Sequence, residues 1–210
     1  MSARLLALCC LAALDASLGS AGPNRLKDPD LVVYLTADTP QPSEPLQQMQ
    51  LELTALMFSA GYRLGWRSGA DVSAAVNSGA LVLVELHGYC GAGQGSLATE
   101  PPEAAASLAF SYVAGGRVLP FSTVNCGNLT RVIAPALAGA PQLRRDYLYG
   151  RAMARLLAHE LYHILANTLE HGRQGIAQSA FSARNLLADG FAFAPADRAQ
   201  LDGGASRGPQ

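Results

Sequence analysis

The sequence predicts an α/β sandwich, a class in which strands and helices pack in layers. Two short runs rich in β-branched and apolar residues, at 31–36 and 80–86, are typical of buried strands. Apolar residues at helical spacing lie between them, and a longer helical pattern follows in the last third of the chain. Half of the 210 residues are hydrophobic, which excludes a disordered chain because there is ample apolar surface to bury.

The elements follow in order along the chain. After the strand at 31–36, Leu46, Met49, Leu53 and their neighbours predict an amphipathic helix over about 46–60 that ends near Gly61. The remaining strands are expected at 62–67, at 80–86, and at 108–113 and 118–124, the last two split by a turn at 114–116. The stretch 88–107 consists mainly of Gly, Pro, Ala and Ser, so we expect a long irregular loop there.

The C-terminal part of the chain is predicted to be helical. The helix runs from Gln142 to about Asn167, and its outward face is expected to carry Arg144, Arg145, Arg151 and Arg155. A short helix should extend from an N-cap at Ser182 through Leu187. Residues 202–210 are predicted to be a disordered tail.

The first 21 residues are typical of a signal peptide. A single cation, Arg4, precedes an apolar run from Leu5 to Leu14, and small residues follow at 19–21. An uncleaved anchor is the alternative, but ten apolar residues are too few to span a bilayer. A lipoprotein site at Cys9 or Cys10 is less favoured because Leu8 is not a small residue. We therefore expect a signal peptide at 1–21, one domain at 22–201, and a secreted or periplasmic protein.

Signal cleavage would leave two of the four cysteines, Cys90 and Cys126. An even pair in an oxidising compartment favours one disulfide, and two buried free thiols are the alternative. The net charge of −1, with no basic block, argues against nucleic acid as a partner. No later segment reaches 18 uninterrupted apolar residues, so we expect no membrane partner after signal removal. We also expect a monomer.

Three of the four histidines lie between positions 159 and 171, where the chain reads His159-Glu160-Leu161-Tyr162-His163. On a helix, residues four apart share a face, so His159 and His163 can direct two imidazoles at one metal ion. Glu160 lies beside them, where it can accept a proton from a water without being a ligand. A surface helix with unrelated polar residues is the alternative.

Catalytic zinc needs three protein ligands and an open position, and His171 is the predicted third ligand. It lies eight residues after His163, so the helix must end near Asn167 or Thr168 for the chain to turn back. Glu170 and Asp189 are the competing third ligands. His87, at the end of a predicted strand, is expected to be structural rather than substrate-binding.

These residues resemble the metzincin zinc peptidases, and in particular a set of small secreted bacterial metzincin-like proteins. Their motif reads roughly HELGHxxxxxxxH followed by Gly-Ile-Met, and His159–His163, His171 and Gly175-Ile176-Ala177 fall at the matching places. The resemblance implies a small mixed β-sheet, an amphipathic helix and a long active-site helix. It also implies that the strand at 108–113 forms the rim of the cleft and runs antiparallel to an extended peptide.

The resemblance implies a secreted zinc peptidase that acts on a peptide or protein substrate. Zn²⁺ would be held by His159, His163 and His171, with Glu160 as the catalytic base. Two positions depart from the motif: Ala177 replaces the usual Met, and Tyr162 replaces the usual Gly. Tyr162, Tyr147 and Tyr149 are candidates for stabilising an oxyanion. The alternatives are an inactive metal-binding domain of the same fold and a non-peptidase zinc hydrolase.

Overall fold

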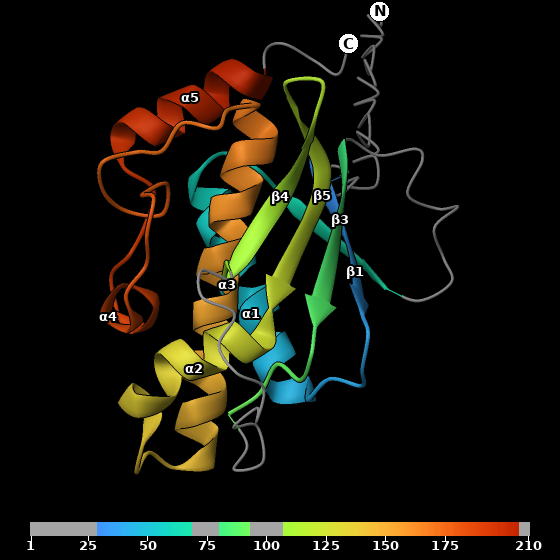
Figure 1. Ribbon diagram of the computed structural model, residues 1–210. Coiled ribbons are helices and arrows are strands. Elements are labelled where there is room, and N and C mark those ends of the chain that lie inside the picture. The colour runs from blue at the N-terminus through green and yellow to red at the C-terminus, as the bar shows by residue number, and fades with distance from the viewer. Residues whose placement is uncertain (1–28, 69–79, 93–106, 206–210) are drawn as a thin grey trace, which may run out of the picture.

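The computed structural model describes residues 29–68, 80–92 and 107–205, and Figure 1 shows the arrangement of their elements. The predicted signal peptide and most of the predicted loop at 88–107 lie outside these residues. The elements, in chain order, are β1 (Leu31–Ala37), α1 (Ser43–Ser59), β2 (Leu64–Ser68), β3 (Ala80–His87), β4 (Ala109–Ala114), β5 (Arg117–Asn125), α2 (Cys126–Leu137), α3 (Gln142–Ala166), α4 (Ala183–Leu187) and α5 (Pro195–Ala205).

The five described strands form one mixed sheet in the order β2-β1-β3-β5-β4. The first four of these run parallel, and β4 pairs antiparallel with β5 at the edge of the sheet. The register of β4 and β5 shifts after the pair Ser111 and Ser122, so that 119–121 lie opposite the single residue Tyr112. Pro120 lies within this irregularity, as expected for a residue that cannot donate to a strand ladder. The small mixed sheet of the predicted α/β class is therefore present.

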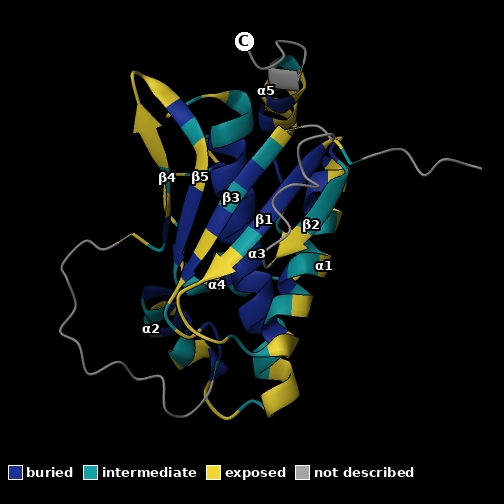
Figure 2. Cartoon of the chain, turned by 90° about the vertical axis from the view of Figure 1, so that its right-hand side faces the viewer, coloured by how far each residue is buried: buried dark blue, intermediate teal, exposed yellow. Residues whose placement is uncertain are grey.

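Helices α1 and α3 cover one face of the sheet, and Figure 2 shows the buried strand residues in front of them. The inward side chains of β3, Val82, Val84 and Leu86, are at most 1% exposed. The two helices approach closely at Gly150, where an added Cβ would lie 2.5 Å from the carbonyl oxygen of Pro45. This packing places the middle of α3 against the core of the domain.

Two helices were not predicted from the sequence. Helix α2 contains Pro135 and Gly127, which weaken a helical pattern, yet it buries Leu129 and Ile133. Helix α5 extends to Ala205, so the predicted tail is wrong for residues 202–205. Leu201 of this helix is fully buried, and its carbonyl accepts a hydrogen bond from the hydroxyl of Tyr62 at 3.0 Å. That contact anchors α5 to the core at the residue before the predicted tail.

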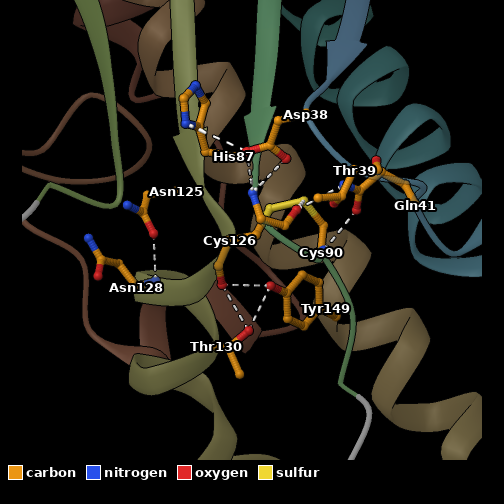
Figure 3. The surroundings of a disulfide bond; sticks show 11 residues. Asp38, Thr39, Gln41, His87, Cys90, Asn125, Cys126, Asn128, Thr130 and Tyr149 are labelled. Atoms are coloured by element: carbon orange, nitrogen blue, oxygen red, sulfur yellow. Dashed lines mark hydrogen bonds and ion pairs between the residues drawn. A yellow bond between two sulfur atoms is a disulfide. The ribbon is translucent and has the colours of Figure 1, made fainter. Parts of the chain in front are cut away.

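The predicted disulfide is present between Cys90 and Cys126, whose Cα atoms are 4.9 Å apart. It joins the segment after β3 to the first residue of α2 (Figure 3). Gln41 supports one side, since its amide oxygen accepts from the N–H of Cys90 at 2.8 Å and its nitrogen donates to the Gly88 carbonyl at 2.8 Å. On the other side, the hydroxyl of Tyr149 donates to the carbonyl of Cys126 at 2.9 Å. Among the described helices, none is long and apolar enough to cross a membrane.

Candidate metal centre

Helix α3 carries the first three residues of the predicted site. His159, Glu160 and His163 lie on its last turns, and each is at most 7% exposed. The helix ends at Ala166, and Asn167 takes the left-handed conformation with φ 46° and ψ 52°. Asn is one of the few residues other than Gly that adopt this conformation readily at a helix end. The predicted end of the helix at Asn167 or Thr168 is therefore confirmed.

The chain reverses after Asn167 and brings His171 back to the helix. One ligand atom from each of His159, His163 and His171 lies within 4.8 Å of the other two. The His171 ring is 5.3 Å from that of His159 and 4.8 Å from that of His163, measured between centroids. Neither competitor for the third ligand, Glu170 nor Asp189, belongs to this group, and Asp189 instead pairs with Arg151 at 2.8 Å.

The hydrogen bonds of the buried histidines leave their Nε2 atoms facing one another. Nδ1 of His159 lies 2.8 Å from the Ile176 carbonyl oxygen, and Nδ1 of His163 lies 2.7 Å from that of Thr168. A carbonyl only accepts, so this network assigns the proton to Nδ1 in both rings and the lone pair to Nε2. The two Nε2 atoms are 3.0 Å apart. Two nitrogen ligands of a tetrahedral zinc ion lie roughly 3.3 Å apart, so the spacing of these two nitrogens is compatible with zinc.

Burial favours the neutral form of the His159 and His163 imidazoles. The pKa of His159 is lowered to about 4, mainly by burial and to a smaller extent by the neighbouring His163 and His171, while the hydrogen bond to Ile176 opposes the decrease. Burial also lowers the pKa of His163. Neutral imidazole is the form that binds a metal, so at neutral pH the rings are ready to act as ligands without losing a proton.

Glu160 is as buried as His159 and His163, but its side chain contacts a hydrogen-bond donor rather than a backbone carbonyl. Burial raises the pKa of its carboxyl group to about 7, while a hydrogen bond from Ser111 opposes this increase. Oγ of Ser111 donates to Oε2 of Glu160 at 2.7 Å. A carboxyl group with a pKa near neutrality can both accept and return a proton. Ser111 was not predicted, because a single serine on a strand carries no signal in the sequence.

The segment 172–178 orients the ring of His159 through the carbonyl group of Ile176. The N–H of Gly172 donates to the Ala177 carbonyl at 2.7 Å, which closes the turn that includes Ile176. Gly175 has φ of +71°, and an added Cβ would lie 2.3 Å from the Ala192 carbonyl oxygen, so both conformation and space require glycine there. Ala177 and Ile176 are fully buried. The position where the motif has Met therefore lies in the core, filled by a smaller side chain.

Two arginines of α3 attach the following segment to the helix. Arg151 and Arg155 are 6% and 1% exposed, so the prediction that they lie on the outside is wrong. Arg155 donates to the carbonyl oxygens of Asn185, Leu186 and Ala188 at 2.6–2.9 Å and lies 3.4 Å from Glu52. Helical periodicity predicted an exposed face, but α4 and the residues after it cover that face of α3.

The remaining candidates lie outside the histidine group. His87 is about half exposed and lies 3.1 Å from a carboxylate oxygen of Glu85. The Tyr162 hydroxyl donates to Gln200 at 2.7 Å, Tyr149 bonds to Cys126, and Tyr147 pairs with Arg151. All three tyrosine hydroxyls are thus engaged elsewhere, which does not support their predicted role as oxyanion stabilisers.

A scan against protein-family models and a search of curated proteins found no match to this chain. The geometry of the site therefore carries the functional interpretation.

Proposed function

We propose that this protein is a secreted zinc-dependent peptidase, with Zn²⁺ bound by His159, His163 and His171. The observation that carries the proposal is that one ligand atom from each of the three histidines lies within 4.8 Å of the others. Two of these histidines lie on α3, and the third follows the chain reversal after Asn167. The Nε2 atoms of His159 and His163, 3.0 Å apart with no proton assigned between them, support a cation as the occupant. Three histidines leave one tetrahedral position open, which is typical of catalytic rather than structural zinc.

A bound zinc ion would supply Lewis acidity, which polarises a peptide carbonyl and acidifies a water molecule. Glu160 accepts the proton of the attacking water on its carboxylate and delivers it to the leaving amine. Burial raises the pKa of the Glu160 carboxyl group, which favours its acceptance of the water proton. The two buried histidines keep their ring orientation through their Nδ1 hydrogen bonds to backbone carbonyls.

Strand β4 is the proposed docking edge for the peptide. It lies at the end of the described sheet and pairs on one side only, with β5. An unpaired strand edge can take up an extended peptide through backbone hydrogen bonds. Ser111 of this strand contacts Glu160, so a peptide bound along β4 would lie near the base.

The test is cleavage of a fluorescence-quenched peptide library by zinc-loaded protein, with Glu160→Gln as the matched variant. We expect the wild type to cleave peptides. Glu160→Gln should retain zinc binding but lose turnover on the order of 1,000-fold, because the substitution removes the base while keeping the shape of the side chain. Zinc binding without any peptide turnover would favour the inactive metal-binding domain. Cleavage of esters or simple amides but not of peptides would favour a non-peptidase zinc hydrolase.

A further inference from the structure

We infer that Ser111 is a positioning residue for Glu160, which holds one carboxylate oxygen so that the other remains available for proton transfer. This inference rests on the proposed function, since it assigns a partner to the proposed base. The Ser111 hydroxyl lies 2.7 Å from Oε2 of Glu160. No other described residue donates a hydrogen bond to this carboxylate.

The hydrogen bond joins two elements that are far apart in the sequence. Ser111 lies on β4 and Glu160 on α3, 49 residues later. Because Glu160 is only 5% exposed, water offers little competition for the contact. A hydrogen bond to a buried carboxylate is stronger than one between neutral groups, so it can select one orientation of the side chain.

The hairpin of β4 and β5 is also fastened to α3 at a second point. Oδ1 of Asn167 accepts from the N–H of Val118 on β5 at 3.0 Å. The two anchors, Glu160 and Asn167, both precede the chain reversal and lie about two helical turns apart. The hairpin is therefore held against α3 by both of its strands, which limits how far Ser111 can move away from the base.

The local geometry of β4 directs Ser111 toward the helix. Its neighbours Phe110 and Tyr112 are 42% and 46% exposed, and their rings pack against each other 5.1 Å apart. Since side chains alternate along a strand, Ser111 faces the opposite way. The register irregularity begins directly after Ser111, and such irregularities often re-aim a side chain near a functional site.

The chain offers a matched control in Ser122. It pairs with Ser111 in the register of the two strands, but its hydroxyl bonds to the Phe110 carbonyl at 3.3 Å and not to Glu160. Ser122 is 2% exposed, so Ser122→Ala removes a buried hairpin hydroxyl without touching the base. Ser111→Thr keeps the hydroxyl at the site and serves as the conservative variant.

The experiment measures kcat, KM and zinc affinity of the wild type, of these two variants and of Ser111→Ala, using the best peptide from the library. For Ser111→Ala we expect kcat to fall about tenfold with KM and zinc affinity within twofold of wild type. Ser111→Thr should recover most of the lost kcat, and Ser122→Ala should keep wild-type kcat. An unchanged kcat in Ser111→Ala, or an equal loss in Ser122→Ala, would overturn the inference.

A crystal structure of Ser111→Ala decides the inference even without turnover. A Glu160 carboxylate that is displaced or adopts several orientations supports positioning by Ser111. A carboxylate that keeps its wild-type position overturns it. Absence of peptide cleavage by the wild type would refute the proposed function alone and leave this structural comparison valid.

Discussion

The two halves of helix α3 bury polar groups in different ways. In the first half, the Tyr149 hydroxyl is fully buried and bonds both to the Cys126 carbonyl and to the Thr130 hydroxyl. In the second half, His159 and His163 use only Nδ1 for backbone contacts, and their Nε2 atoms face each other. A buried polar atom without a partner costs about 1–3 kcal/mol. The polar groups in the first half of α3, next to the disulfide, thus bond to one another, whereas those in the second half, the histidine end, leave nitrogen atoms that could bind a metal.

The largest expected difference between the two halves of α3 is the effect of a substitution on zinc affinity. We expect His163→Ala to lower zinc affinity by at least about 100-fold, because the remaining two histidines cannot complete a three-ligand site. The measurement is competition for zinc against a chromophoric chelator. Tyr149→Phe is the control and should keep wild-type affinity, since its hydroxyl belongs to the other half. Equal zinc affinity in His163→Ala and wild type would contradict the assignment of this ligand.

Removal of the disulfide should affect stability rather than metal binding. The double variant Cys90→Ala with Cys126→Ala should lower the free energy of unfolding by roughly 2–4 kcal/mol, because the bond closes a loop over a sequence separation of 36 residues. Urea unfolding checks this value. Zinc affinity should stay within threefold of wild type. A loss of affinity comparable to that of His163→Ala would show that the two halves are not independent.

The smallest expected effect concerns Asn167, which ends α3. Asn167→Gly keeps access to the left-handed conformation and should cost about 1 kcal/mol, through loss of the hydrogen bond to Val118. Asn167→Ala should cost roughly 1 kcal/mol more, because Ala is strained at φ 46°. Thermal or urea unfolding of both variants gives the comparison. Equal stability of the two variants would show that the backbone conformation contributes little.

Local patterns predicted much of the fold and the grouping of the three histidines. The strands, α1, α3 and α4 follow from apolar spacing and from caps such as Ser182, which does form its predicted cap with Asn185. The grouping of His159, His163 and His171 follows from helical periodicity and the need for a chain reversal. These features depend on residues close together in the sequence, where periodicity and capping act directly.

Features that depend on distant residues were not predicted. The burial of Arg155 requires α4 to pack across α3, and helical periodicity alone cannot indicate that partner. Ser111 contacts Glu160 only because the hairpin folds against α3. Helix α2 was missed because Pro135 and Gly127 weaken its local signal, while its stability comes from burial of residues such as Leu129.

We propose that the histidine end of α3 holds one zinc ion. Metal analysis after equilibrium dialysis against zinc tests it most directly, with wild type compared with the His159→Ala, His163→Ala double variant. We expect one zinc ion per wild-type chain and none in the double variant, with both proteins folded. A wild type that retains no zinc, or a double variant that retains a full equivalent, would contradict it.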